Sequence, residues 1–418
     1  MSRCVVIGSG AREHALAWAL AKSANVVVTP GNAGIAAHGI TCVTTPATEL
    51  DADLFVIGPD QQVVDGLADD LRSQGKTVFG PGADGAQLEG SKAFMKEFLA
   101  SAGIPTAQFG VFDNEHDALA YLATMSPPYV IKTDGLAAGK GVLVTNDLDD
   151  AAADVREKLS GVSFAGAGRT IVIEEGLDGP ECSLMVLCDG KKVTALVASQ
   201  DFKRVGDGDV GSNTGGMGAY APFPIMTPEL FADVMENVVA PTVGELARRD
   251  IDYRGVLYAG VMLTSKGPKL LEYNARFGDP ETQVLVPLYG DGLFDLLLGV
   301  ANGDLDGAAP EAKGAAVTVV LAAYGYPGAP RAGDVISGLA ADGQLAEPVE
   351  GVTIFHAGSA RNDAGQFVTA GGRVVAVTGV GDTLEQARSR AYRGASLVTF
   401  EGRVMRSDIA LSIAGGAT

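Results

Sequence analysis

Short apolar runs alternate with amphipathic stretches over the first 80 residues of the chain. "RCVVIG", "NVVVTP" and "ADLFVIGPD" are separated by helical patterns such as "REHALAWALAK". Apolar strands alternating with helices are typical of a parallel sheet covered on both faces. Ligands of such sheets bind beyond the carboxyl ends of the strands. Those ends here carry "GSGAR" (8–12), "PGNAG" (30–34) and "GPD" (58–60).

The remaining pattern predicts two further domains. A helix follows Ser91, a plausible N-cap, and a compact strand–helix unit covers about 105–177. A hairpin about Asp189-Gly190, a helix over 228–249 and the strand pair "GVLYAGVMLT" and "PKLLEYNARF" come next. Connectors at "GPGADGAQLEG" and 301–316 divide the chain into domains 1–90, 91–310 and 311–418, the last with strands and a helix starting at Thr383. The predicted class is a multidomain α/β and α+β protein.

Composition narrows the class of partner. The 418 residues are 47% hydrophobic and carry a net charge of −20. Such a charge argues against nucleic-acid or anionic-membrane binding, whereas local Lys and Arg residues still allow small anionic ligands. The cysteines show no C-x-x-C spacing, and the N-terminus lacks a signal-peptide pattern. We therefore expect a soluble, cytoplasmic protein.

A row of polar side chains follows two leucines in "LLEYNARFGDPETQ" at 270–283. If "KLLEYNARF" is a strand, Glu272, Asn274 and Arg276 share one face. Carboxylate and amide oxygens are ligands that Mg²⁺ prefers, and the Arg276 fork suits a carboxylate or a phosphate. The structural alternative is a surface ladder in which Glu272 pairs with Arg276. We expect a central strand that binds Mg²⁺ (or Mn²⁺) together with a nucleotide's phosphates.

Glycines and lysines gather in "KTDGLAAGKGV" at 132–142. Backbone N–H groups of such a loop can bind phosphates, whose charge Lys92 and Lys132 can neutralise. The Walker pattern is not met, since no Ser or Thr follows Lys140. The alternatives are a solvated hairpin tip and ordinary surface lysines. The strand end "IVIEEGLDG" (171–179) either binds adenosine, through Glu175 or a neighbour, or simply leaves the core.

The first glycine turn, "GSGAREHA", matches a dinucleotide fingerprint only in part. Glu13 stands where the third glycine belongs, and no acidic residue ends the second strand. NAD binding is therefore disfavoured. A tight strand-to-helix turn and a small phosphate site at the helix N-terminus both remain open.

Acid–base chemistry by histidine is not indicated. The histidines at 14, 38, 116 and 356 form no cluster along the chain, and nothing resembles a Ser-His-Asp arrangement. "SQDFKR" (199–204) and "NTGGMGAY" (213–220) add charged groups and a backbone-rich loop. Charge neutralisation and positioning would then carry the chemistry, as in phosphoryl transfer.

The order of these segments resembles that of ATP-grasp ligases, most closely the glycinamide ribonucleotide synthetase family (phosphoribosylamine–glycine ligases). The likeness covers essentially the whole chain, and "RFGDPETQ" is its most specific motif, followed by "DGLAAGKG" and "NTGGMGAY". The resemblance implies a Rossmann-like N-terminal domain, an ATP-grasp core with a small lid lobe near 108–175, and a C-terminal β-rich domain. The implied reaction of purine synthesis joins glycine to 5-phosphoribosylamine through glycyl phosphate, giving glycinamide ribonucleotide, ADP and phosphate.

Matched motif positions imply a role for each site residue. The implied metal ligands are Glu272 and Asn274. The implied ATP-binding residues are Lys92, Lys132, Gly139, Lys140, Gly141, Glu174, Glu175 and Leu177. Arg276, Asp279 and Asp201 would place glycine and the amine, together with Gly215, Gly216, Met217 and Gly218. The ribose phosphate would be bound by Gly8, Gly10, Asn32, Ala33, Gly34 and Asp60.

The chain departs from the family pattern at Phe202, Ser212 and Asp60, where the family reads His, Pro and Glu. Competing hypotheses are another ATP-grasp enzyme with a different carboxylate and acceptor, a nucleotide-binding regulator without turnover, and an NAD-dependent oxidoreductase. The expected partners are ATP, glycine and 5-phosphoribosylamine. We expect a monomer, with a transient hand-over of the unstable amine from the preceding enzyme as a further interaction that this reaction allows.

Overall fold

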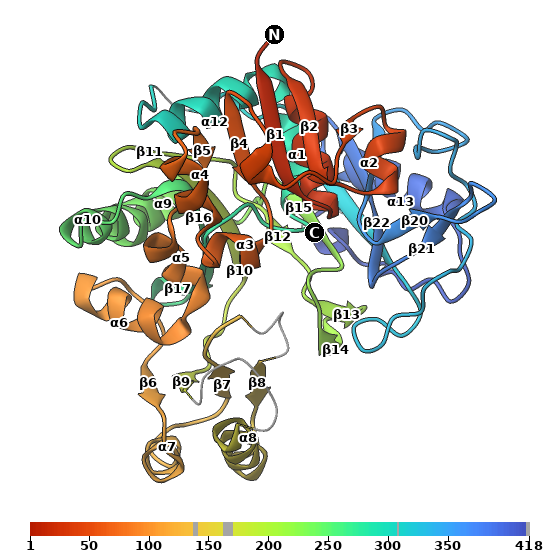
Figure 1. Ribbon diagram of the computed structural model, residues 1–418. Helices are drawn as coiled ribbons and strands as arrows, with labels where there is room; N and C mark the ends of the chain where they lie inside the picture. Colours follow the sequence, from red (N-terminus) through yellow and green to blue (C-terminus); the bar gives the residue numbers. More distant parts are fainter. Residues whose placement is uncertain (137–140, 162–169, 307–308, 415–418) are drawn as a thin grey trace.

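The computed structural model describes residues 1–136, 141–161, 170–306 and 309–414. The N-terminal domain is a parallel sheet of order β3-β2-β1-β4-β5 with helices on both sides (Figure 1). Its strands are β1 (Arg3–Gly8), β2 (Asn25–Pro30), β3 (Thr41–Cys42), β4 (Leu54–Ile57) and β5 (Val78–Phe79). Its helices are α1 (Ala11–Leu20), α2 (Ala33–Ala37), η1 (Ala47–Glu49), α3 (Asp60–Val64), α4 (Leu67–Ser73) and α5 (Ala83–Gly90). The apolar runs form the buried strands, as predicted.

A small antiparallel sheet of order β6-β9-β7-β8, the lid lobe, projects from the rest of the molecule (Figure 1). Its elements are β6 (Phe109–Phe112), α7 (Glu115–Leu122), β7 (Tyr129–Thr133), β8 (Val142–Thr145), α8 (Leu148–Ser160) and β9 (Ile171–Glu175). Ala118, Ile131, Val155 and Ile173 belong to its own apolar core, separate from the cores of the main body. The lobe therefore packs as a unit of its own.

The large lobe is built on an antiparallel sheet of order β11-β10-β16-β17. Its strands are β10 (Glu181–Asp189), β11 (Val193–Ala195), β16 (Arg254–Thr264) and β17 (Gly267–Asn274). Its helices are α6 (Lys92–Ala102), α9 (Pro228–Val234), the π-helix η2 (Met235–Val239), α10 (Ala240–Arg248), α11 (Thr282–Leu285), η3 (Val286–Leu288), η4 (Gly290–Gly292) and α12 (Leu293–Asn302). The expectation that "KLLEYNARF" is a central strand is wrong: β17 lies at the edge of the sheet and ends at Asn274. Its side chains still alternate between the two faces of the sheet.

The C-terminal domain contains a five-stranded sheet of order β12-β15-β18-β22-β19. The strands are β12 (Gln200–Asp201), β15 (Gly218–Ala221), β18 (Ala315–Ala322), β19 (Val352–His356) and β22 (Arg373–Gly381). Two hairpins and two helices accompany it: β13 (Arg204–Gly206) with β14 (Val210–Asn213), β20 (Ser359–Arg361) with β21 (Phe367–Thr369), α13 (Leu384–Leu397) and α14 (Leu411–Ala414). Because β12 and β15 come from the segment before residue 310, this sheet joins the two parts of the chain.

Three histidines meet where the N-terminal and C-terminal domains pack together, so the expectation of no histidine cluster is wrong. His14 Nε2 and His38 Nδ1 are 3.0 Å apart, and the backbone N–H of His356 donates to His14 Nδ1 at 2.9 Å. The His356 ring contacts Ser359 Oγ and the Gly343 carbonyl. The three histidines are far apart in the sequence, so the sequence pattern could not show this contact. It lies at the interface between the two domains.

Within the described residues, no single helix has the length and hydropathy needed to cross a membrane. The helices over 282–288 and 290–302 meet that criterion only when combined across a bend of 112°.

Candidate active site

The polar face of β17 is the starting point of the site. Glu272, Asn274 and Arg276 are half-buried on one side, while Tyr273 and Ala275 are at most 2% exposed on the other. The predicted alternation is therefore present, although Arg276 lies in a bend just after the strand. Three polar groups consequently face the same space.

Glu272 is surrounded by positive charge and has no close partner. Within the described residues its carboxylate makes no hydrogen bond or ion pair. Burial raises the pKa of Glu272, but the charges of Lys203, Lys132 and Lys92 outweigh burial and lower it below its ordinary value. An ionised, unpaired carboxylate beside an amide oxygen fits a divalent cation, so Glu272 and Asn274 suit Mg²⁺ or Mn²⁺.

Arg276 is held in place by its own chain. Its Nη2 lies 2.8 Å from Glu89 Oε1 and donates to Asn274 Oδ1 at 3.1 Å, while its Nε is buried without a partner. The surface ladder with Glu272 is thus not formed, since Glu89 of α5 is the ion-pair partner. Sequence reasoning missed Glu89, which stands in the predicted connector "GPGADGAQLEG" and is buried beneath the site.

The base of the lid is tied to the start of α6. Ser91 Oγ and the Ala93 N–H donate to Asp134, and Lys92 Nζ donates to the Gly135 carbonyl at 2.7 Å. These contacts place the predicted phosphate-binding Lys92 beside the glycine-rich segment. Of that segment, Gly141 accepts a hydrogen bond from the Thr133 N–H, whereas Gly139 and Lys140 lie outside the described residues.

Glu174 lies in a buried charge cluster that joins lid and body. Its oxygens are 2.9 Å from Lys132 Nζ on β7 and 3.0 Å from Lys96 Nζ on α6. Lys96 also donates to Thr106, and burial lowers its pKa to about 8 although Glu174 opposes this shift. The Glu174 side chain is 2% exposed, so any contact with adenosine would come from its backbone. Lys96, which sequence reasoning missed, lies one helical turn after Lys92.

Glu175 is the more accessible carboxylate at the end of β9. It pairs with Lys269 at 2.7 Å and accepts a hydrogen bond from the Gln108 N–H. The hydrogen bond from Lys269 lowers the pKa of Glu175. Leu177 follows β9 and is half-buried. Both residues thus lie at the junction of lid and large lobe, where adenosine is predicted to bind.

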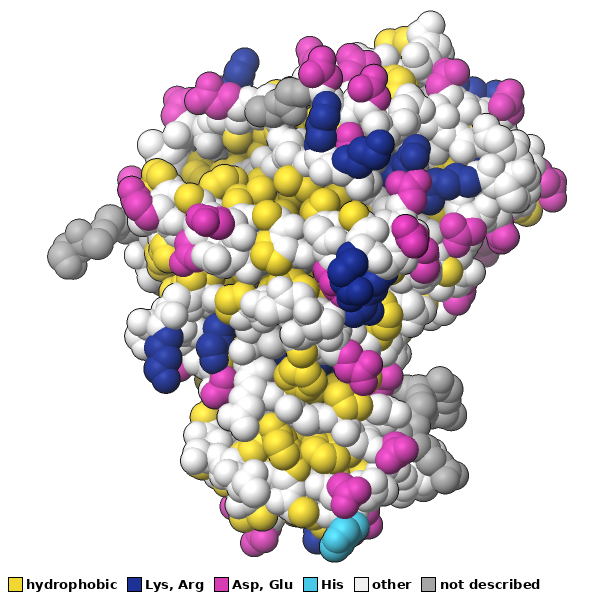
Figure 2. Space-filling view, turned by 90° about the vertical axis from the view of Figure 1, so that its left-hand side faces the viewer, with side chains coloured by type: hydrophobic (Ala, Val, Ile, Leu, Met, Phe, Trp, Pro, Cys, Tyr) yellow, Lys and Arg dark blue, Asp and Glu magenta, His cyan; other side chains and the backbone are white. Residues whose placement is uncertain are grey.

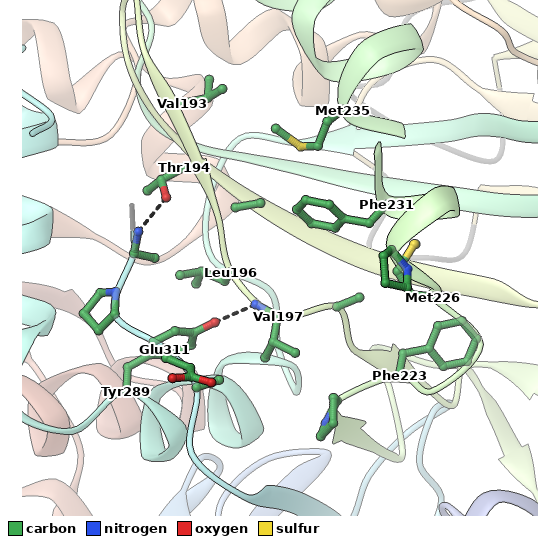
Figure 3. A pocket seen from close by; sticks show the side chains of 17 residues that line it. Val193, Thr194, Leu196, Val197, Phe223, Met226, Phe231, Met235, Tyr289 and Glu311 are labelled. Carbon is green, nitrogen blue, oxygen red and sulfur yellow. Dashed lines mark hydrogen bonds between the residues drawn. The ribbon is translucent and has the colours of Figure 1, made fainter. Parts of the chain in front are cut away.

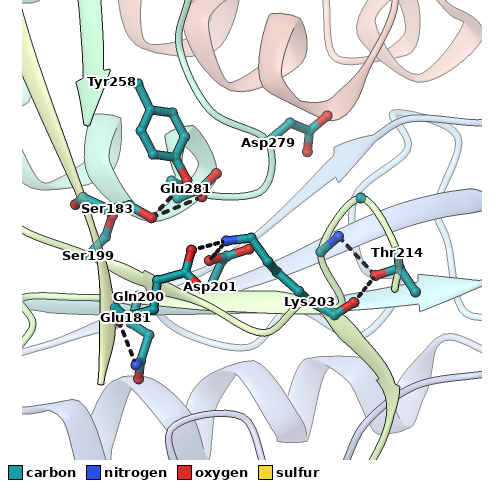
Figure 4. A network of polar contacts seen from close by, with 12 residues as sticks. Glu181, Ser183, Ser199, Gln200, Asp201, Lys203, Thr214, Tyr258, Asp279 and Glu281 are labelled. Carbon is teal, nitrogen blue, oxygen red and sulfur yellow. Dashed lines mark hydrogen bonds and ion pairs between the residues drawn. The ribbon is translucent and has the colours of Figure 1, made fainter. Parts of the chain in front are cut away.

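A second charge network surrounds Lys203 and joins Glu181 of β10 to Asp201 of β12 (Figure 4). Lys203 Nζ is 2.6 Å from Glu181 and 2.9 Å from Asp201, and these carboxylates, against the effect of burial, raise the pKa of Lys203 well above its ordinary value. Lys203 also lowers the pKa of Glu272, so the two networks face one another. The motif "SQDFKR" predicted charged groups here, but the resemblance implied a role only for Asp201.

Glu281 is a buried acid next to this network. Its Oε1 accepts hydrogen bonds from the Tyr258 hydroxyl at 2.5 Å and from Ser183 at 3.3 Å (Figure 4). Burial, with the nearby Asp201 charge, raises the pKa of Glu281 to about 7. Its place in the motif "RFGDPETQ" was visible in the sequence, but its environment was not.

Asp279 and the 213–218 loop lie against each other. Arg373 of β22 joins them, with Nη2 3.1 Å from Asp279 Oδ2 and Nη1 donating to the Gly215 carbonyl. The Gly216 backbone packs so close to Pro280 that a Cβ would overlap with the ring. Met217 is fully buried, and Gly218 begins β15. The structure therefore brings Asp279 together with Gly215, Gly216, Met217 and Gly218.

The N-terminal glycine turn is filled by the chain's own carboxylate. Glu13 Oε2 accepts the Gly10 N–H at 2.6 Å, and its Oε1 pairs with Arg12 at 2.5 Å. Gly8 has φ +130°, and a Cβ there would meet the Glu13 side chain. Gly10 in turn adjoins the Asp279 carboxylate. The turn thus borders the site, but its helix N-terminus already has an anion.

The second strand end is similarly engaged. Asn32 caps α2, accepting from the Gly34 and Ile35 N–H groups, and its Nδ2 donates to Ser9 and to the His356 carbonyl. A Cβ on Gly34 would overlap with the His356 ring, and Ala33 beside it is half-buried. Asp60 begins α3 and raises the pKa of Arg276, so it faces the site from the third strand end.

A cavity of about 840 Å³ lies elsewhere, along the free edge of β11 (Figure 3). Val193, Leu196 and Phe231 contribute to its apolar wall, and no Lys or Arg is among the described residues that line it. Hydrophobic side chains gather on this face of the molecule (Figure 2). Such a surface does not suit a triphosphate, and the polar site near β17 remains the candidate for chemistry.

Comparison with known proteins places this geometry in a family. Three family models of phosphoribosylglycinamide synthetase match this chain. The N domain model matches residues 2–89, the ATP-grasp (A) domain model matches 90–282, and the C domain model matches 316–412. The chain belongs to the phosphoribosylamine–glycine ligase family. Phosphoribosylamine–glycine ligases of Xanthomonas axonopodis pv. citri and Streptomyces coelicolor are each 46% identical to it, over 97% and 99% of this chain and 97% and 100% of theirs.

Solved structures agree with this family and with its fold. The crystal structure of phosphoribosylamine–glycine ligase from Thermotoga maritima is similar with a TM-score of 0.87 and 38% identity, covering 98% of this chain and 100% of that one. The biotin carboxylase domain of Hydrogenobacter thermophilus 2-oxoglutarate carboxylase has a TM-score of 0.72 at 17% identity, over 97% of this chain and 91% of that one, and shares the fold alone. The predicted family, fold class and ligase class are confirmed.

Proposed function

We propose that this phosphoribosylamine–glycine ligase family member joins glycine to 5-phosphoribosylamine with the cleavage of ATP, in purine synthesis. The observation that carries the proposal is the unpaired Glu272 carboxylate, which faces Lys92, Lys132 and Lys203 beside the Arg276 fork. A carboxylate ringed by cations fits a metal–triphosphate complex, and a guanidinium next to it fits the second reactant.

The chemistry follows from the weakness of a carboxylate as an electrophile. A glycine carboxylate oxygen attacks the γ-phosphorus of ATP, forming an O–P bond as the bond to ADP breaks. The phosphoribosylamine nitrogen then attacks the carbonyl carbon of glycyl phosphate, a C–N bond forms, and phosphate leaves as the nitrogen loses a proton. The protein contributes mainly orientation and charge, as in other phosphoryl transfers.

Each group of residues has a role in this proposal. Glu272 and Asn274 would hold Mg²⁺ or Mn²⁺, which supplies charge neutralisation for the phosphates. Lys92 and Lys132 approach the phosphates from α6 and β7, and the end of β9 borders adenosine. Arg276 and Asp279 orient the amino acid and the amine. The strand ends at 30–34 and 58–60 face the ribose phosphate, whereas the turn after β1 borders it with the Gly10 N–H already bound by Glu13.

Formation of ADP with single omissions tests the proposal. The complete mixture of ATP, Mg²⁺, glycine and 5-phosphoribosylamine should release ADP and phosphate, and leaving out any one component should reduce release to background. Turnover that persists without glycine, or that requires another carboxylate, would instead indicate an ATP-grasp enzyme with a different substrate.

A further inference from the structure

A set of hydrogen bonds fastens the tip of the β13–β14 hairpin to the chain near its C-terminus. The segment Arg406–Asp408, here named the 406–408 segment, lies against the tip formed by residues 207–209. Ser407 donates to the Asp207 carboxylate from both its N–H (2.8 Å) and its Oγ (2.5 Å). The Gly208 N–H donates to Asp408 Oδ2 at 2.8 Å. The tip is thus bound at successive residues, across about two hundred positions of sequence.

Arg406 is the centre of this contact. Its side chain is 1% exposed, and its guanidinium bonds Asp209 at 2.5 Å and both oxygens of Asp408 at 2.7 and 2.6 Å. The same group lies 4.8 Å from the Phe202 ring centroid. A buried guanidinium is tolerated only when its N–H groups have partners, so the hairpin and Arg406 depend on one another.

The two ends of the hairpin carry parts of the proposed site. Lys203 immediately precedes β13, and Thr214 immediately follows β14. The Thr214 N–H and Oγ both donate to the Lys203 carbonyl, at 2.8 and 2.9 Å. Any shift of the hairpin would therefore move Lys203 and the 213–218 loop together. Figure 1 shows the hairpin below the C-terminal domain, to the right of the lid lobe.

We propose that Arg406 is a positioning residue for the ligase reaction: through the 406–408 segment it holds the hairpin so that Lys203 and the 213–218 loop face β17. This inference rests on the proposed function. Phe202 supports it, since its ring centroid lies 4.8 Å from the Arg406 guanidinium and an aromatic face attracts a cation.

The sharpest test removes the anchors on the hairpin side, because Asp207 and Asp209 are exposed and their loss spares the core. The variant is Asp207→Ala with Asp209→Gly, since glycine suits the φ of +57° at position 209. The matched control is Asp363→Ala with Glu347→Ala, which removes the same charge from exposed residues that make no hydrogen bond or ion pair within the described part of the chain. Both proteins are assayed for ADP formation, with glycine and amine varied separately from ATP.

The expected result is a loss of about 10- to 100-fold in kcat/KM for glycine and the amine in the hairpin variant, with the KM for ATP equal to that of the control. The unfolding midpoint should fall only slightly below that of the control, because Arg406 keeps both bonds to Asp408. Equal kcat/KM in variant and control would overturn the inference. The kcat/KM of an Arg406→Lys protein should lie between those of the hairpin variant and the control, because a point charge cannot make the forked contact. An Arg406→Lys protein with unaltered kcat/KM would also contradict it. If the unaltered chain forms no glycine- and amine-dependent ADP, the proposed function itself fails.

Discussion

Two regions of this molecule present polar groups near the site, and they differ in what those groups contact. At the β17 face, the Glu272 carboxylate has no hydrogen-bond or ion-pair partner within the described residues, and the charges of Lys203, Lys132 and Lys92 lower its pKa against the effect of burial. At the start of α1, the Gly10 N–H is already bound by Glu13, whose other oxygen pairs with Arg12. The sequence predicted a metal ion with a nucleotide's phosphates at the first region, and left a phosphate site or a structural turn open at the second. The first is incomplete without a ligand, whereas the second is complete without one.

The difference shows how to separate a binding site from a structural turn. The charges of Lys203, Lys132 and Lys92 keep the Glu272 carboxylate ionised, but no donor of the described residues bonds its oxygens, so these oxygens are available to a metal ion. At the α1 turn the Gly10 N–H donates to the chain's own Glu13 carboxylate, so this helix N-terminus needs no ligand. We therefore expect substitutions at β17 to reduce turnover and substitutions at the α1 turn to reduce stability.

The largest effect is expected for Glu272→Gln. The amide keeps the volume but loses the charge that a divalent cation requires, so kcat should fall by about 10²–10³ with little change in unfolding midpoint. Steady-state ADP formation at saturating Mg²⁺ measures it. A kcat equal to that of the unaltered chain would remove Glu272 from the proposed metal site.

The second-largest loss of activity is expected for Arg276→Lys. The Arg276 fork contacts Glu89 and Asn274 at once, and a lysine cannot make both contacts, so kcat/KM for glycine and the amine should fall by about 10- to 100-fold. Measuring KM for each substrate separately shows where the loss lies. A loss confined to ATP would contradict the assignment of Arg276 to the second reactant.

Glu13→Gln tests the other side of the comparison. The glutamine can still accept the Gly10 N–H but leaves Arg12 without its charge partner, so the free energy of unfolding should fall by about 1–3 kcal/mol. Urea unfolding measures this, and kcat/KM should stay within about threefold. Lost turnover with unchanged stability would mean that the Glu13 carboxylate contacts substrate.

The smallest effect concerns pH. The pKa of Glu281 is raised to about 7 from an ordinary value of 4.5, so the folded protein holds this proton more tightly than the unfolded chain does. The stability contributed by Glu281 is therefore present at low pH and is lost as pH rises through about 7. As pH rises from 5 to 8, the free energy of unfolding of Glu281→Gln should increase by about 1–3 kcal/mol relative to that of the unaltered chain. Urea unfolding at each pH measures this. A difference that is independent of pH would contradict this environment for Glu281.

Local patterns predicted much of the fold. The apolar runs became β1, β2 and β4, the Asp189-Gly190 turn joins β10 to β11, and alternation in "LLEYNARF" set the polar face of β17. Sequence alone did not show that β17 is an edge strand, because strand order depends on contacts between distant segments. For the same reason Glu89, Lys203 and Arg373, which complete the site from three other elements, could not be assigned beforehand.

Binding of Mn²⁺ in the presence of ADP, followed by electron paramagnetic resonance, tests the central claim most directly. The account predicts that Glu272→Gln loses the bound Mn²⁺ signal, while Glu13→Gln, folded at the same temperature, binds Mn²⁺ as the unaltered chain does. Equal Mn²⁺ affinity in Glu272→Gln and the unaltered chain would contradict the claim that the β17 face holds the metal.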